Sequence, residues 1–267
     1  MNEGRIAINN TEINYRIDGP SDAPGVVLGN SLATNYSMWD AQIDALTERY
    51  RVLRYDKRGH GASEVGNAEI SIESLADDVV VLARELDFLG GHFVGLSIGG
   101  MVGQALGINH PETFRSLTLC ATTSRISEEA FPIWEGRIST AKTEGMDALV
   151  EPTLQRWFTD TYRAAEPIQV AQVGQMVVAT SVAGYVRCSR AIMKLNYTER
   201  LNAISAPTLV VPGERDPALP VSMSEVIAAE IPGAQMEVVE GAAHLCNIEQ
   251  AGAFNRIVRG FLDRQPG

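Results

Sequence analysis

The sequence predicts an α/β protein with a doubly wound, mostly parallel sheet and an inserted helical segment. Three observations lead to this prediction. Short apolar runs alternate with longer stretches of helical spacing along most of the chain, which is the order expected of βαβ units. The first two apolar runs alternate with polar residues, which is typical of half-exposed antiparallel strands. The alternation of strands and helices stops between about residues 123 and 203.

Eight short runs are interpreted as strands, and five longer segments as helices. The expected strands span 5–9, 13–18, 25–29, 50–56, 92–95, 116–121, 207–213 and 235–241. Later runs such as VVL and TLVV are apolar at successive positions, as in strands that are buried on both faces. The expected helices span 37–49, 71–89, 98–109, 220–231 and 248–263, where apolar residues recur at helical spacing.

We expect residues 123–203 to form a helical cap on a core made of residues 1–122 and 204–267. This segment has helix-like stretches and no convincing strand. Its large apolar residues are expected to dock the cap on the core. They are Trp134, Trp157, Phe158, Tyr162, Met176, Tyr185 and Met193.

Composition limits the partners and the compartment. The formal net charge of −11 and the sequence pI near 4.9 make nucleic acid and anionic membranes unfavourable partners. No apolar run reaches about 18 residues, and the first residues lack the apolar region of a signal peptide. Three widely spaced cysteines fit neither a disulfide framework nor a zinc site. We therefore expect a cytoplasmic monomer or small homo-oligomer.

The stretch HFVGLSIGG places Ser97 in a G-x-S-x-G pattern between a predicted strand and a predicted helix. Alone, the pattern fits a small residue in a tight turn as well as a nucleophile. A serine hydroxyl attacks only when a base takes its proton and a third group orients that base. Ser97 is therefore a candidate nucleophile only if suitable partners lie elsewhere in the chain.

Asp216 and His244 are candidate partners for Ser97, because each follows one of the last two predicted strands. In open α/β sheets, sites form outside the carboxyl ends of the strands. Since all three residues follow predicted strands, we expect them to meet at one edge of the sheet.

Other residues compete for these roles. Glu214 lies two residues before Asp216 and would need a different loop geometry to replace it. Three further histidines are present, but none follows the last predicted strand: His60, His92 and His110. Cys120 and Cys246 have no evident basic neighbour, so we expect them to be packing residues.

The chain order Ser97, Asp216, His244 is the nucleophile–acid–histidine order of the α/β-hydrolase superfamily, which this sequence resembles over nearly its whole length. Gly95 and Gly99 would remove side chains that clash at a sharp turn between strand and helix. The stretch YDKRGHGAS matches the family's D-x-R-G-x-G-x-S loop, which we interpret as mainly structural.

The resemblance also implies an oxyanion hole, whose donors stabilise the transition state by about 3–4 kcal/mol each. In the stretch LGNSLATN, the residues NSL stand where many relatives have His-Gly-x. The expected donors are the backbone N–H groups of Leu32 and Ile98. If the register differs by one residue, Ser31 replaces Leu32.

Within the superfamily, the sequence resembles the 3-oxoadipate enol-lactonases. Three stretches carry this resemblance: GNSLATNYSMWDAQIDAL, YDKRGHGAS and GLSIGGMVGQALGINHPE. It implies hydrolysis of a small lactone that carries a carboxylate, in the 3-oxoadipate (β-ketoadipate) branch of aromatic-compound breakdown. The implied mechanism is a Ser-His-Asp triad with an acyl-enzyme, which requires neither a metal nor an organic cofactor.

A small anionic lactone or ester would need local positive charge in this acidic chain. Arg187, Arg190 and Lys194 are spaced at i, i+3 and i+7, so they share one face of a helix. Trp134 and Arg137 form an alternative substrate-binding pair. An ordinary solvated helix face remains the other interpretation of the three cations.

The sequence is also compatible with two other functions. A carboxylesterase or a cofactor-free haloperoxidase would share the triad and differ in the cap. A non-catalytic ligand-binding protein could also use this fold, because a fold does not imply one function.

Overall fold

The computed structural model describes residues 2–265 and places eight strands in one mixed sheet. The strands are β1 (Asn2–Ile8), β2 (Thr11–Asp18), β3 (Gly25–Gly29), β4 (Arg51–Tyr55), β5 (His92–Leu96), β6 (Ser116–Cys120), β7 (Thr208–Val211) and β8 (Gln235–Met236). Their order across the sheet is β1-β2-β4-β3-β5-β6-β7-β8. β1 pairs antiparallel with β2, β2 pairs antiparallel with β4, and the other pairs are parallel. The predicted sheet is confirmed.

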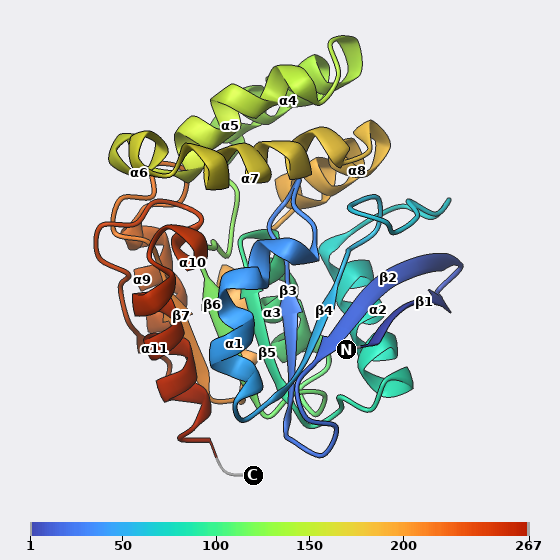
Figure 1. Cartoon of the computed structure of the whole chain (residues 1–267), viewed down its shortest axis with the longest axis vertical. Helices are drawn as coiled ribbons and strands as arrows, with labels where there is room; N and C mark the ends of the chain where they lie inside the picture. Colours follow the sequence, from blue (N-terminus) through green and yellow to red (C-terminus); the bar gives the residue numbers. More distant parts are fainter. Residues whose placement is uncertain (1, 266–267) are drawn as a thin grey trace.

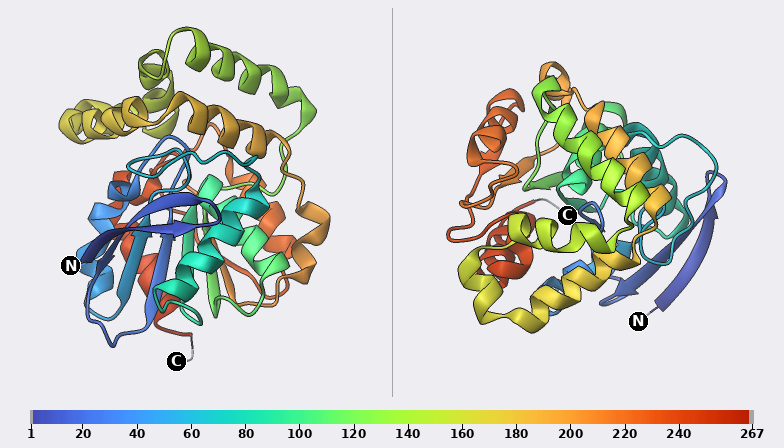
Figure 2. Two further views of the ribbon diagram at one scale, coloured as in Figure 1. Left: turned by 90° about the vertical axis from the view of Figure 1, so that its right-hand side faces the viewer. Right: turned by 90° about the horizontal axis from the view of Figure 1, so that it is seen from above.

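Helices cover both faces of the sheet (Figure 1 and Figure 2). α1 and α11 lie together on one face, whereas α2, α3 and α9 lie on the other. Their bounds are α1 (Asp40–Thr47), α2 (Ile72–Glu85), α3 (Ile98–Asn109), α9 (Val221–Glu230), α10 (Cys246–Glu249) and α11 (Ala251–Leu262). A short 3-10 helix, η1 (Tyr36–Trp39), precedes α1.

Two elements near the C-terminal end differ from the sequence prediction. The helix expected over 248–263 is interrupted at Gln250, whose φ of −128° and ψ of 51° are not helical, so α10 and α11 are separate. β8 ends at Met236 instead of continuing to residue 241. After β8, the chain pairs with the residues that follow β7 only through a bridge between Gly213 and Val239. Pro212 lacks an N–H group, so it accepts a hydrogen bond from Val239 but cannot donate one to a ladder.

Residues 123–203, which we call the cap, contain five α-helices that lie over the carboxyl ends of the parallel strands (Figure 1). They are α4 (Phe131–Thr143), α5 (Val150–Trp157), α6 (Asp160–Ala165), α7 (Pro167–Ala179) and α8 (Val182–Met193). The same residue range contains three 3-10 helices: η2 (Glu128–Ala130), η3 (Asp147–Leu149) and η4 (Thr198–Ala203), of which η4 packs against α3 and α9 of the core. Within this fully described segment, an isolated bridge between Arg125 and Asn196 is the only β pairing.

The cap meets the core closely at the loop after β4. The backbones of Gly59 and Gly184 lie so close that a Cβ atom on either residue would overlap the other. Ser181, which precedes α8, donates from its backbone N–H and from its hydroxyl to the carbonyl oxygen of Gly59 (3.3 and 3.1 Å). Only glycine allows this approach, so the two glycines determine how closely α8 packs on the core.

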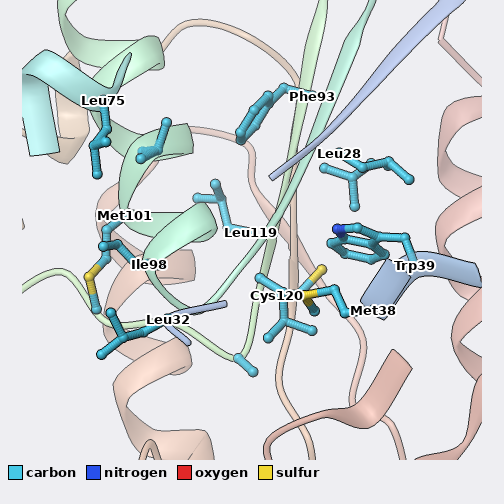
Figure 3. Packing of buried hydrophobic residues seen from close by; sticks show 14 of the residues in the cluster. Leu28, Leu32, Met38, Trp39, Leu75, Phe93, Ile98, Met101, Leu119 and Cys120 are labelled. Atoms are coloured by element: carbon cyan, nitrogen blue, oxygen red, sulfur yellow. The ribbon is translucent and has the colours of Figure 1, made fainter. Parts of the chain in front are cut away.

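The core is packed around the central strands, and Figure 3 shows part of it. Leu28, Phe93 and Leu119 come from three neighbouring strands and are fully buried. Met38 and Trp39 extend this packing into η1, and the indole Nε1 of Trp39 donates to Asn30 Oδ1 at 3.0 Å. Burial of side chains of this size stabilises the fold by about 1.5–3 kcal/mol each. The packing of Met38 and Trp39 therefore fixes the position of the loop after β3.

Within residues 2–265, no helix is long and apolar enough to cross a bilayer. In the same range, no group of three or more His, Cys, Asp or Glu side chains is arranged to hold a metal ion. All three cysteines are buried and unpaired: Cys120, Cys188 and Cys246.

Candidate active site

Ser97 occupies a sharp turn between β5 and α3. Its φ of 60° and ψ of −118° lie in a region that non-glycine residues rarely adopt, at a cost of about 1–3 kcal/mol. Two hydrogen bonds hold the strained residue: its N–H donates to the carbonyl oxygen of Cys120 (2.9 Å), and Thr122 Oγ1 donates to its carbonyl oxygen (2.8 Å). The hydroxyl of Ser97 is thus presented by a rigid backbone.

The glycines of the G-x-S-x-G pattern permit close backbone contacts around Ser97. A Cβ atom on Gly95 would overlap the carbonyl group of Gly99. A Cβ atom on Gly99 would overlap the carbonyl group of Gly29, at the end of β3. Because larger residues would force α3 away from the sheet, the glycines fix where the serine stands.

His244 and Asp216 form a buried pair. His244 Nδ1 lies 2.6 Å from Asp216 Oδ2, and their side chains are only 5% and 0% exposed. The other carboxylate oxygen, Oδ1, accepts hydrogen bonds from the backbone N–H groups of Ala218 (2.8 Å) and Leu219 (3.0 Å). The Nδ1 proton therefore points at the carboxylate, which leaves Nε2 of His244 as the nitrogen that can accept a proton.

The competing residues are engaged elsewhere. Glu214 Oε2 accepts a hydrogen bond from the N–H of Gly241 at 2.7 Å, and its side chain is half exposed. Of the four histidines, all within the described residues, only His244 lines the large cavity described next. The others contact groups outside it: His60 with Arg58 O, His92 with Ser116 Oγ and His110 with Asp77.

A cavity of about 640 Å³ lies between the core and the cap, and both Ser97 and His244 line it. Its wall is formed from both sides, with Met101 from the core and Tyr185 from the cap among the lining residues. Trp157 of α5 also lines it and stacks on the imidazole of His244, with ring centroids 6.2 Å apart and planes inclined by 24°. The cap therefore both encloses the cavity and packs against the histidine.

In the loop after β3, the backbone N–H groups of Ser31 and Leu32 differ in their hydrogen bonding. The N–H of Ser31 donates to Met38 Sδ at 3.2 Å, so it is occupied. Among residues 2–265, no hydrogen bond joins the N–H of Leu32 or of Ile98 to another group, and Leu32 lines the cavity. Of these two N–H groups, only that of Leu32 has no partner within the described residues, so Leu32 remains the expected donor.

The three predicted cations, Arg187 and Arg190 of α8 and Lys194 directly after it, lie away from the cavity. Arg187 Nη1 donates to the carbonyl oxygen of Gly66 at 2.8 Å, and Lys194 Nζ pairs with Glu69 at 2.8 Å. Arg190 is exposed, and none of the three is among the residues that line the cavity. Arg187 and Lys194 therefore contact the segment that precedes α2. The structure thus does not bring these three predicted residues to the site.

Trp134 and Arg137 of α4 do line the cavity, as predicted. Two arginines that were not predicted also line it: Arg156 of α5 and the exposed Arg125. The guanidinium of Arg137 lies 5.1 Å from the ring centroid of Trp134. Burial lowers the pKa of Arg137, and burial and then repulsion by Arg137 lower the pKa of Arg156 to about 10. Among residues 2–265, neither arginine has an ion-pair partner, and no carboxylate side chain lines the cavity.

Arg156 could not be paired with Arg137 from the sequence, because the two residues come from different helices. Its place beside Trp157 in a stretch of helical spacing was the one available signal. Arg156 Nη2 donates to Thr153 Oγ1 at 3.1 Å, which keeps the guanidinium along the cavity wall. The guanidinium groups of Arg137 and Arg156 are partly buried and, within the described residues, lack ion-pair partners in a largely apolar cavity, an arrangement that favours the binding of an anion.

Known proteins resemble this chain over nearly its whole length. The family model described as the alpha/beta hydrolase fold matches residues 24–251. The 3-oxoadipate enol-lactonases 1 and 2 of Acinetobacter baylyi are 35% and 32% identical to it, over 94% and 97% of this chain and 92% and 96% of theirs. The crystal structure of the enol-lactonase from Burkholderia xenovorans superposes with a TM-score of 0.94 at 39% identity, covering 98% of this chain and all of that one.

Proposed function

The chain is a hydrolase of the α/β-hydrolase family, and we propose that it opens a small, carboxylate-bearing enol-lactone of the 3-oxoadipate type. One observation carries the proposal: Ser97, His244 and two partly buried arginines without ion-pair partners among the described residues line a single cavity. The first two supply the means to cleave an ester bond, and the arginines select an anion. The similarity to enol-lactonases supports the choice of a lactone.

In the first half of the reaction, His244 Nε2 takes the proton of Ser97 Oγ while Oγ bonds to the lactone carbonyl carbon. Asp216 holds the imidazole in the required tautomer and stabilises its charged form. The negative charge that develops on the carbonyl oxygen is bound by the N–H groups of Leu32 and Ile98.

Collapse of this intermediate breaks the bond between the carbonyl carbon and the ring oxygen. The ring oxygen leaves as an enolate and takes the proton from His244 Nε2, and the resulting enol can become the ketone. His244 then removes a proton from water, which attacks the acyl carbon. Release of Ser97 Oγ, with its proton returned from His244, completes the turnover.

The two arginines account for the substrate's free carboxylate. A guanidinium that is partly desolvated and unpaired gains about 1.5–3 kcal/mol from a charge-assisted hydrogen bond to a carboxylate. Because Arg137 and Arg156 repel each other, an anion placed between them also relieves that repulsion. The acidic surface of the protein, with a net charge of −11, makes this local concentration of positive charge necessary.

The decisive experiment is a substrate panel with the wild type and Ser97→Ala. The wild type should hydrolyse 3-oxoadipate enol-lactone at least about 100-fold faster, by kcat/KM, than phenyl acetate, and Ser97→Ala should be inactive on both. A preference for simple esters would instead identify a carboxylesterase. Failure of a fluorophosphonate to label Ser97 would point to a non-catalytic binding protein.

The arginines are tested with a pair of esters that differ in charge, mono-p-nitrophenyl glutarate and p-nitrophenyl valerate. Arg156→Met and Arg137→Met should each raise KM for the anionic ester by roughly 10- to 100-fold and leave the neutral ester within about twofold. Arg187→Met is the matched control, because that arginine lies outside the cavity, and it should change neither KM. Equal effects of Arg156→Met on both esters would refute the anion site.

A further inference from the structure

Neither the triad nor the cap explains why Lys57 is buried without an ion-pair partner. It follows β4, is only 5% exposed, and among residues 2–265 it belongs to no ion pair. Its ammonium donates to the carbonyl oxygen of Ser31 at 2.6 Å. Burial of a charge without a partner costs several kcal/mol, so a lysine with only a structural role would be an unfavourable choice here.

The carbonyl that Lys57 holds belongs to the same peptide group as the N–H of Leu32. In a trans peptide the C=O and N–H bonds point in opposite directions, so a group that fixes the oxygen also aims the hydrogen. Thr34 Oγ1 donates to the same oxygen at 2.9 Å. The N–H of Leu32, at the other end of this peptide group, has no hydrogen-bond partner among residues 2–265, and Leu32 lines the cavity.

We propose that Lys57 is a positioning residue for the oxyanion hole: its ammonium aims the N–H of Leu32 at the reacting carbonyl oxygen, and its charge polarises that peptide group. This inference rests on the proposed attack by Ser97. A positive charge at the carbonyl end draws electrons from the peptide, which makes the N–H a stronger donor. Because the charge is already in place before reaction, the donor needs no reorganisation in the transition state.

The acidic and basic groups on the loop itself are held by other partners. Asp56, the residue before Lys57, accepts hydrogen bonds from the N–H of Tyr36 (2.7 Å) and of Ala62 (3.0 Å). Asn14 Nδ2 donates to it as well, at 2.9 Å. The next residue, Arg58, forms a two-pronged ion pair with Asp78 of α2 (2.5 and 2.7 Å).

The remaining titratable neighbours of Lys57 stay uncharged near neutral pH. Burial raises the pKa of the Cys188 thiol of α8 to about 11 and raises the pKa of Tyr55. Burial, together with the charge of Lys57, lowers the pKa of His60 well below its usual value. Burial lowers the pKa of Lys57 itself to about 8. Lys57 is thus the member of this group that titrates just above neutral pH.

The test compares the wild type with Lys57→Met and Lys57→Arg, using hydrolysis of p-nitrophenyl valerate followed from pH 6 to 10. Lys57→Met should lower kcat by about 10-fold or more at pH 7 with KM changed by less than about threefold, because the lost interaction acts on the transition state. Wild-type kcat should fall as the pH rises through about 8, and this fall should be absent in Lys57→Met. Lys57→Arg should retain most of the activity and move the fall to higher pH.

Val52→Ala is a control for general destabilisation, because Val52 is fully buried in β4, near the end of the strand that is remote from Lys57. It should lower the melting temperature and leave kcat and the pH profile unchanged. The rate at which a neutral fluorophosphonate labels Ser97 provides a second readout, since its P=O oxygen occupies the oxyanion position. This rate should fall in Lys57→Met in parallel with kcat.

The possible outcomes separate the two proposals. If Ser97→Ala is inactive but Lys57→Met keeps the wild-type kcat or the alkaline fall, the role of Lys57 is wrong and the proposed function stands. A rise in KM with unchanged kcat would also overturn it, because that pattern indicates a loss of uniform binding. If Ser97→Ala remains active, the proposed function itself fails.

Discussion

Lys57→Met should make the protein more stable at neutral pH while it makes the enzyme slower. Burial lowers the pKa of Lys57 from 10.5 to about 8, and each pKa unit corresponds to about 1.4 kcal/mol. The buried charge therefore costs the folded state roughly 3 kcal/mol. Methionine has a similar length and no charge, so the substitution removes this cost. Loss of the hydrogen bond to Ser31 costs about 1 kcal/mol, which leaves a net gain of about 2 kcal/mol.

The gain should depend on pH in a defined direction. Below pH 8, Lys57 is protonated in both the folded and the unfolded chain, and the folded wild type carries the whole cost. Between pH 8 and 10.5 the unfolded chain binds more protons than the folded one, so wild-type stability rises with pH relative to Lys57→Met. Above pH 10.5 only the lost hydrogen bond remains, and the variant should be slightly less stable.

The assay is urea unfolding of both proteins at pH 7 and at pH 10, which gives the difference in the free energy of unfolding at each pH. Groups that titrate in both proteins cancel in this difference. A variant that is less stable than the wild type at pH 7 would refute the reasoning, as would a difference that does not change with pH. Either result would mean that the ammonium of Lys57 is well solvated or paired in solution.

Three further predictions concern the site and the cap. Asp216→Asn should lower kcat by about 10⁴-fold, because the amide favours the wrong tautomer of His244; steady-state kinetics that show less than a tenfold loss would contradict this role. Glu214→Gln should leave kcat within about twofold, because Glu214 binds Gly241 and not the histidine. Gly184→Ala should lower the melting temperature by several degrees, because the new Cβ atom would overlap Gly59. An unchanged melting curve would show that α8 can move away from the core without loss of stability.

Much of the architecture around Ser97 could be predicted because its signals are local. Apolar runs mark buried strands, and the carboxyl ends of parallel strands meet at one edge, so Ser97, Asp216 and His244 could be placed near each other. The end of β8 could not be predicted in this way. The run QMEVVEG has strand character, but its pairing depends on Pro212, which lies in the neighbouring strand's extension and lacks a donor.

The contacts of the cap residues could not be predicted from the sequence. Helical spacing predicts a shared face for Arg187, Arg190 and Lys194, but α8 ends at Met193 and spacing does not say which neighbour these residues meet. Arg137 and Arg156 come together only because α4 and α5 both border the cavity. Lys57 was equally hidden, since a lysine in a glycine-rich loop looks solvent-exposed until α8 is packed over it.

The contact between Gly59 and Gly184 defines what can be exchanged among relatives. Recombination that swaps caps with crossovers at residues 123 and 203 would move Gly184 and leave Gly59 behind. A donor cap with any larger residue at the position of Gly184 would then collide with the recipient loop. The transferable module is therefore the cap together with the loop 57–61, and a library of chimeras built on this unit should contain far more folded members than one built on the cap alone.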